Sequence, residues 1–220
     1  EKPGWATPSY DASGWNNAAS VDGPAGTLVP QTMPPVRVTD TLEPEKITEP
    51  EPGHYVFDFG QNMAGWARLH VSGSRGDKVK MRYGERLNDD GTLDQEAIAK
   101  FVKEGEFQTD TYILDGDGRE TWEPSFTYHG FRYVEVTGFP GEPTKDSLEA
   151  RVVNTDARRA GTFRCSNEMF NRVQHQALWA YRSNYVGYPT DCPQREKNGW
   201  TGDAQLAVEQ AMYNWDNTAA

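Results

Sequence analysis

The period of the hydrophobic positions changes along the chain and divides it into three segments. The first, residues 1–50, has no regular period and holds many of the prolines, among them Pro3, Pro34, Pro35 and Pro50. Proline removes a backbone donor and fixes φ, so we expect no long helix or strand there. We interpret this segment as the tail of an N-terminal β domain and a linker.

Hydrophobic residues alternate with a period of two through much of the second segment, residues 51–157. Such alternation is typical of half-buried strands. The turn residues Asp115–Gly118 predict a hairpin between strands at 109–114 and 120–122. Further strands are expected at residues 66–71, 78–83, 131–136 and 148–153. About seven short antiparallel strands imply a β-sandwich and a mainly β fold class.

The period becomes 3.6 in the third segment, residues 158–220. Ser166–Asn167 supplies an N-cap, and the apolar stripe that follows predicts a helix of about four turns. A second helix is expected at 204–212, capped by Asp203 or, if the helix begins one turn earlier, by Thr201. Two helices joined by a long loop do not bury both of their apolar faces. We therefore expect this segment to be the beginning of an incomplete helical domain.

Charge and composition exclude several classes of partner. The chain carries 33 acidic side chains against 22 basic ones, a net charge of −11, and no basic cluster. Nucleic acid and anionic membrane surfaces are therefore not expected as partners. No apolar run approaches the roughly 20 residues that span a bilayer. Cys165 and Cys192 form neither a disulfide framework nor a CxxC motif, and we expect no metal and no cofactor.

The loop between the two predicted helices concentrates the groups that sugar chemistry uses. Three carboxylates, Asp191, Glu196 and Asp203, lie at spacings of five and seven residues, with Arg195 and Trp200 among them. Cleavage of a glycosidic bond needs a carboxylic acid to protonate the leaving oxygen, and further polar groups hold the ring hydroxyls. The residues alone leave another interpretation open, in which Asp203 caps a helix and Arg195 pairs with Glu196 at the surface.

Three stretches of the sequence carry a resemblance to a known family. They are Phe57–Trp66, Trp122–Val134 and the phrase DCPQREKNGWTGDAQ at Asp191–Gln205. Through them the chain resembles the α-L-rhamnosidases of glycoside hydrolase family 78 over most of its length. The resemblance implies an antiparallel, concanavalin-like or jelly-roll-like β-sandwich at 51–157. It implies that the first helices of a truncated α/α barrel follow at 158–220.

The same resemblance implies roles for the residues of the loop. Glu196 would be the general acid, and Asp191 and Asp203 would hold rhamnose hydroxyls. Arg195 would brace these groups, and Trp200 would line the sugar subsite. Family members invert configuration with a second glutamate as base, which we expect beyond the last residue of this chain. The chain is thus expected to act on rhamnosides, releasing terminal α-L-rhamnose, only together with the rest of the enzyme.

Two other functions stay open at the level of the sequence. One is a non-catalytic carbohydrate-binding or structural β-sandwich module whose helices serve as a docking arm. The other is a toroid-type glycosidase or polysaccharide lyase of different specificity. In each case the apolar helix faces predict self-association of the chain or pairing with the rest of the enzyme.

Overall fold

The computed structural model describes residues 4–100, 102 and 104–218. The chain divides into two units, Glu1–Gln31 and Thr32–Ala220. In the described part of the first unit the backbone forms turns and extended stretches, without a helix or a strand. All of the regular structure described below belongs to the second unit.

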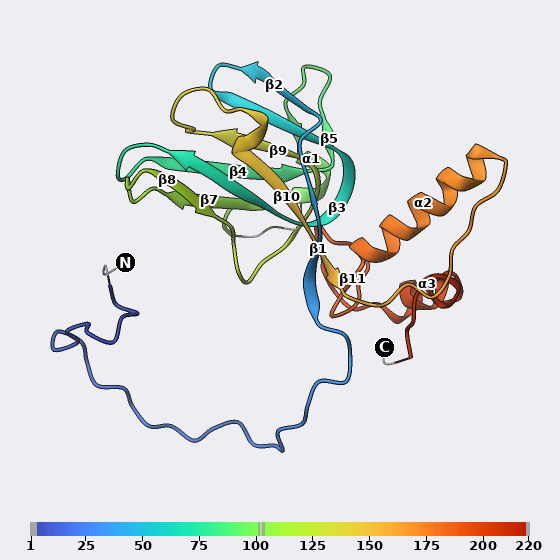
Figure 1. Ribbon diagram of the computed structural model, residues 1–220, viewed down its shortest axis with the longest axis horizontal. Coiled ribbons are helices and arrows are strands. Elements are labelled where there is room, and N and C mark those ends of the chain that lie inside the picture. Colours follow the sequence, from blue (N-terminus) through green and yellow to red (C-terminus); the bar gives the residue numbers. More distant parts are fainter. Residues whose placement is uncertain (1–3, 101, 103, 219–220) are drawn as a thin grey trace. The chain divides into compact units, whose positions relative to one another are not determined.

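An antiparallel sheet of eight strands forms the body of the second unit (Figure 1). Its strands are β1 (Val36–Leu42), β2 (Lys46–Glu51), β3 (His54–Ser72), β4 (Lys78–Gly84), β7 (Thr109–Ile113), β8 (Arg119–Trp122), β9 (His129–Thr137) and β10 (Leu148–Thr155). The first half of β3 pairs with β2 and β9, and its second half pairs with β10 and β8. Because one long strand serves both sets of neighbours, the sheet curls into two layers.

Alternation along these strands places one hydrophobic face in the core. The largest fully buried side chains include Phe57, Met63, Leu69, Met81, Tyr83, Phe131 and Leu148. They come from β3, β4, β9 and β10, at the apolar positions of the period-two pattern. The predicted mainly β, antiparallel fold class is confirmed.

Two short strands lie in the proline-rich segment, where no long helix or strand was expected. Pro34 and Pro35 come directly before β1, and Pro50 lies in the part of β2 where the register shifts between Thr48 and Glu51. At such ends and irregularities a missing N–H removes no ladder bond, so proline is tolerated. Strands of seven and six residues therefore form in this segment despite its many prolines.

The predicted hairpin at Asp115–Gly118 is also wrong. The strand before this turn, β7, pairs with β4, and the strand after it, β8, pairs with β3. The turn is closed by a side chain, since the Glu120 carboxylate accepts the N–H groups of Asp115 at 3.0 Å and Gly116 at 2.8 Å. This carboxylate satisfies donors that a tight hairpin would have used in its ladder.

Helices and short strands complete the second unit. They are β5 (Arg86–Leu87), β6 (Leu93–Asp94), α1 (Glu96–Ala99), the 3-10 turn η1 (Lys145–Ser147), α2 (Glu168–Ser183), β11 (Tyr185–Val186), β12 (Tyr188–Pro189) and α3 (Thr201–Asn214). Helix α2 begins as predicted, and the Asn167 side chain accepts the N–H of Met169 at 3.0 Å. No described helix has the length and apolar character needed to cross a membrane.

The cap predicted for the second helix is not formed. Helix α3 begins at Thr201, and the residue at its N-cap is Trp200, which makes no side-chain cap bond. The Trp200 carbonyl accepts the N–H of Ala204 at 3.0 Å and so starts the helix. Asp203 lies in the first turn, where a negative charge interacts favourably with the helix dipole without accepting a cap bond.

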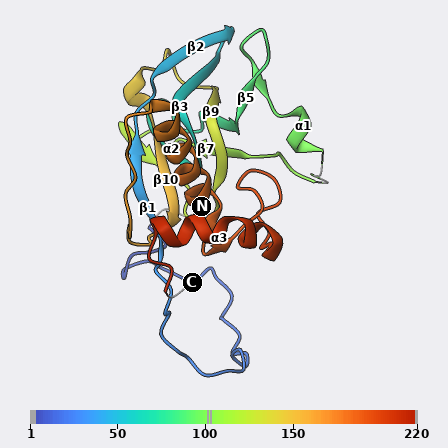
Figure 2. The same ribbon diagram turned by 90° about the vertical axis from the view of Figure 1, so that its right-hand side faces the viewer.

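Helices α2 and α3 lie at the same end of the curled sheet, as Figures 1 and 2 show. Arg182 of α2 reaches β1, where it donates to Thr39 at 2.9 Å and pairs with Asp40. A second, smaller core consists of Ala157, Tyr185, Ala211 and Trp215. The loop that joins β12 to α3 therefore starts and ends on elements that pack beside the sandwich.

Candidate active site

The loop between β12 and α3 is closed at its base by backbone contacts. Thr190 and Gly199 form an antiparallel bridge, and the N–H of Asp191 donates to the carbonyl of Asn198 at 3.1 Å. The Asn198 N–H donates in return to the Asp191 carboxylate, with 3.1 Å between N and Oδ1. These bonds hold the two limbs of the loop side by side, which brings residues from each limb together.

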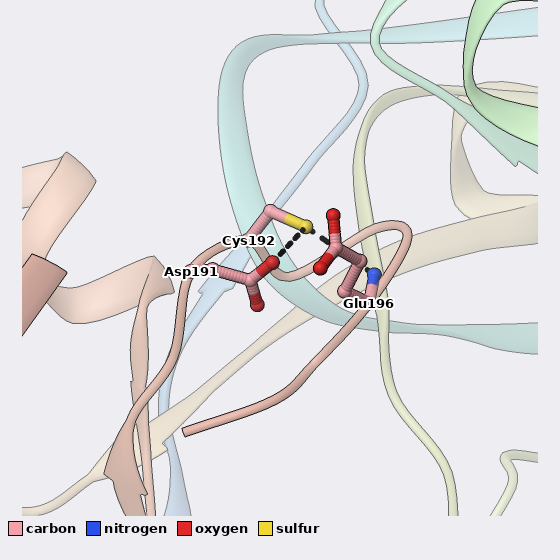
Figure 3. A group of neighbouring side chains, drawn as sticks. All are labelled: Asp191, Cys192 and Glu196. Carbon is pink, nitrogen blue, oxygen red and sulfur yellow. Dashed lines mark hydrogen bonds between the residues drawn. The ribbon is translucent and has the colours of Figure 1, made fainter. Parts of the chain in front are cut away.

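Three side chains of this loop converge on one point (Figure 3). The ligand-forming atoms of Asp191, Cys192 and Glu196 all lie within 4.8 Å of one another. The Cys192 thiol donates to Asp191 Oδ2 at 3.4 Å, and its sulfur accepts the backbone N–H of Glu196 at 3.3 Å. The thiol thus links the two carboxyl-bearing residues that the sequence singled out.

Asp191 is the carboxylate that this network favours in its ionised form. Burial would raise the pKa of Asp191, but hydrogen bonds outweigh that effect and the pKa lies below its usual value. The donors are the backbone and thiol of Cys192, the N–H of Asn198 and the carboxyl of Glu196. Glu196 therefore has a negative charge beside it.

Arg195 forms an ion pair with Glu196. Its Nη2 lies 2.8 Å from Glu196 Oε1, and the two side chains are 34% and 32% exposed. This is the pair that the second interpretation of the sequence expected, and it stands next to the cluster rather than in place of it. Because both side chains are partly exposed, solvent screens the attraction between them.

A cavity of about 1100 Å³ opens beside the loop and is lined by both Asp191 and Asp203. Apolar side chains from α2 and α3 form much of its wall, among them Ala177, Ala204 and Leu206. Concave sites with apolar walls and a few convergent polar groups are the usual form of small-molecule sites. The structure thus brings Asp191 and Asp203 to one cavity, and Asp191 and Glu196 to one cluster.

Glu196, Arg195 and Trp200 do not line this cavity. Trp200 lies at the start of α3 with 51% of its surface exposed, so its indole is open to a ligand or to another chain. Its assignment as a wall of the sugar subsite stays a prediction. Arg195 is engaged with Glu196 at the outer side of the loop.

Asp191, Cys192 and Glu196 also form the one group of described residues with the spacing of a metal site. In this structure the Cys192 thiol donates to the Asp191 carboxylate, and its sulfur accepts the Glu196 N–H.

Comparison with known proteins assigns this loop and the sandwich to one family. Residues 48–154 match the bacterial alpha-L-rhamnosidase concanavalin-like domain. Residues 158–220 match the bacterial alpha-L-rhamnosidase 6 hairpin glycosidase domain. The chain belongs to the bacterial α-L-rhamnosidase family. The concanavalin-like match covers the sandwich except β1 and the first residues of β2, and the hairpin-domain match covers α2, α3 and the loop.

Individual members of the rhamnosidase family align along nearly the whole chain. An alpha-L-rhamnosidase of Streptomyces avermitilis is 42% identical over 99% of the chain, and one of Formosa agariphila is 36% identical over 96%. A solved alpha-L-rhamnosidase from Dictyoglumus thermophilum superposes with a TM-score of 0.92 at 44% identity over the entire chain. The Streptomyces avermitilis enzyme complexed with L-rhamnose gives a TM-score of 0.90. The chain spans only 21% to 24% of the length of these relatives.

Some residues near the loop had no role assigned from the sequence. Cys192 is one of them, since its position between two carboxyl groups depends on a loop closure that spacing does not reveal. Tyr128 was not singled out, yet burial and the nearby Tyr188, Cys192 and Asp191 raise its pKa to about 12. His129 is buried and stacks on Tyr83, with 4.1 Å between the ring centroids.

Proposed function

We propose that this chain supplies the acid-bearing part of an inverting glycoside hydrolase that releases terminal α-L-rhamnose from rhamnosides. The observation that carries the proposal is the convergence of Asp191 and Glu196 in one loop beside a cavity that Asp203 also lines. Relatives that match nearly the whole chain are named alpha-L-rhamnosidase, and one solved relative holds L-rhamnose. Carbohydrate is accordingly the substrate class.

The proposed chemistry divides the work among the loop residues. Glu196 donates a proton to the glycosidic oxygen as the bond to the anomeric carbon breaks. Asp191 and Asp203 accept hydrogen bonds from ring hydroxyls at the wall of the cavity. Arg195 braces the carboxyl groups, and Trp200 offers an apolar face to the sugar. The ionised Asp191 places a negative charge beside Glu196.

The proposal includes a second carboxylate as general base. In inverting enzymes the two carboxyl groups stand roughly 6.5–9.5 Å apart, with a water between them. We place this general base outside residues 1–220, in the helical barrel that begins at 158. In the proposed domain order the sandwich, which includes β1 and β2, precedes this barrel. The 220-residue chain alone is therefore expected to hydrolyse rhamnosides slowly or not at all.

The test is an assay of the full-length gene product that contains this chain with an aryl α-L-rhamnoside. We expect release of L-rhamnose, and proton NMR should detect the β-anomer before mutarotation. A lyase would instead produce an unsaturated ring that absorbs in the ultraviolet, and a binding module would bind rhamnose without turnover. Either of these results would contradict the proposal.

A further inference from the structure

Lys197, the residue after Glu196, has an unusual backbone conformation. Its φ is +55°, in the left-handed region that residues with a Cβ rarely adopt. Both of its peptide groups are engaged, because its N–H donates to the Cys192 carbonyl at 3.2 Å and its carbonyl accepts the Tyr188 hydroxyl at 3.3 Å. A conformation of this cost, on the order of 1–3 kcal/mol, persists only where the surroundings impose it. The turn at Lys197 is thus fixed from both sides.

The side chain of Lys197 reaches the β-sandwich. Its ammonium donates to the backbone carbonyl of Tyr128, just before β9, and lies 4.7 Å from the centroid of the Tyr128 ring. Burial lowers the pKa of Lys197, while the charge of Asp110 opposes that change. A cation that loses water needs such partners, and a carbonyl with an aromatic face supplies them. Lys197 therefore joins the loop to the sandwich.

A second contact joins the loop to the start of β9. A Cβ placed on Gly130 of β9 would lie 2.8 Å from the backbone N of Gln194 and 2.9 Å from Pro193 Cγ. The Gln108 amide holds Gly130 in place, accepting its N–H at 2.8 Å and donating to its carbonyl at 3.1 Å. The loop thus rests directly on the backbone of β9 at a position where only glycine fits.

These two contacts lie on either side of Arg195 and Glu196 in the sequence. Gln194 touches Gly130 before the pair, and Lys197 binds Tyr128 after it. A short segment held at both ends against the start of β9 has little freedom to shift its carboxyl group. Geometry of this kind matters to proton transfer, since a misplacement of about 1 Å can cost roughly 100-fold in rate.

We propose that Lys197 is a positioning residue, which together with the Gly130 contact uses the β-sandwich to set the place of the Glu196 carboxyl. The inference rests on the proposed function and adds a role for the sandwich in it. Lys197 acts on the reaction only through the placement of Glu196 and does not itself touch the substrate. Its loss should therefore affect steps that depend on the acid more than it affects binding.

The test compares Lys197→Met with wild type in the full-length gene product. For an alkyl α-L-rhamnoside, whose leaving group needs protonation, we expect kcat to fall about 100-fold. For 4-nitrophenyl α-L-rhamnoside, whose leaving group departs without much help, kcat should fall less than about 5-fold, with KM changed less than about 2-fold. A general structural defect would reduce both substrates alike, and that result would overturn the proposal.

The matched control is Lys145→Met. The Lys145 ammonium also donates to a backbone carbonyl, that of Glu45 at 2.6 Å, but it lies on η1 and outside the loop. We expect this variant to keep wild-type kinetics on both substrates. A drop equal to that of Lys197→Met would mean that losing any such lysine matters, and would also overturn the proposal.

A further variant covers the case in which Lys197→Met does not fold. Lys197→Gly adopts a positive φ without strain and removes the anchor, so it should fold and show the same dependence on the leaving group. If neither variant folds, Lys197 is a stability residue and the positioning role is refuted. Failure of the proposed function is recognised separately, because then wild type itself releases no rhamnose.

Discussion

Replacing a glycine by alanine can destabilise the fold through a strained backbone conformation or through a steric collision of the new Cβ. Two glycines of this chain separate these effects. Gly138, after β9, has a φ of +72°, and a Cβ placed on it would lie 2.2 Å from the carbonyl oxygen of Lys78. Gly118, in the turn before β8, has a nearly equal φ of +75°, with no atom within 4 Å of such a Cβ. The positions differ in contact and not in backbone.

We expect Gly118→Ala to lower the free energy of unfolding by about 1 kcal/mol, which is the cost of the left-handed conformation alone. Gly138→Ala adds a backbone collision between β9 and β4, and should cost about 3 kcal/mol. Urea unfolding of the two variants beside wild type measures both values. Equal losses would show that the contact with Lys78 relaxes without cost.

Single residues are also where inference from the sequence is least complete. The spacing of the carboxylates and the resemblance of the loop pointed to Asp191 and Glu196, and the structure places these two in one cluster. The positive φ of Lys197 and the thiol bond of Cys192 depend on how the loop closes, which no local pattern encodes. The roles of Lys197 and Cys192 therefore become visible only in the folded loop.

Among the elements, β3 carries the curl of the sheet, and one carboxylate supports the place where its pairing is interrupted. The register of β3 against β9 shifts between Asp58 and Met63. Asp58 accepts two bonds from Arg132 of β9, at 2.7 and 2.8 Å, and the N–H of Gly60 at 2.8 Å. The carboxylate thus satisfies a backbone donor that the ladder leaves unpaired and ties the irregular stretch to β9.

The stability from Asp58 should depend on pH. Burial would raise the pKa of Asp58, but the bonds from Arg132 and Gly60 outweigh it and lower the pKa. A pKa that is lower in the folded state stabilises the fold above the unfolded value of about 4, and this contribution is lost as pH falls through the folded value. Asp58→Asn should therefore lower the free energy of unfolding by about 2 kcal/mol at pH 7 and by progressively less below pH 4.

An exposed pair provides the comparison for Asp58→Asn. Arg37 and Asp156 are 3.4 Å apart, with side chains 64% and 46% exposed. We expect Asp156→Asn to cost about 0.5 kcal/mol or less. Urea unfolding at pH 7 and pH 3 tests both variants. If the loss of unfolding free energy in Asp58→Asn is the same at both pH values, the charge of Asp58 is not what stabilises the irregular stretch of β3.

Elements were the level at which the sequence was most informative, with clear exceptions. Alternation located the strands around the core and the 3.6 period located α2 and α3, because both patterns follow directly from which face is buried. Strand partners were harder, as the turn at Asp115–Gly118 shows. Its two strands find different neighbours, and partner choice is decided by the whole sheet rather than by the turn.

For the whole molecule, the exposed helix faces are the feature with the largest consequence. Apolar side chains more than half exposed include Met169, Phe170 and Val173 on α2 and Leu206, Met212 and Tyr213 on α3. Exposed apolar surface on this scale promotes association. The net charge of −11 opposes association through repulsion, which salt screens.

We expect the isolated 220-residue chain to associate with increasing concentration, and more strongly at high salt. Sedimentation velocity at several concentrations measures this. Leu206→Glu combined with Met212→Glu should shift the chain toward monomer, whereas Leu28→Glu, at a fully exposed position in the first unit, should not. A chain that stays monomeric at all concentrations and salt levels would contradict the expectation.

The role of Glu196 as proton donor is the central claim, and the activity of Glu196→Gln in the full-length gene product tests it most directly. The amide keeps the size of the side chain but cannot donate a proton to the leaving oxygen. We predict that kcat for an alkyl α-L-rhamnoside falls roughly 10²–10⁴-fold with the fold intact by circular dichroism. Turnover equal to wild type in a folded Glu196→Gln variant would contradict the account.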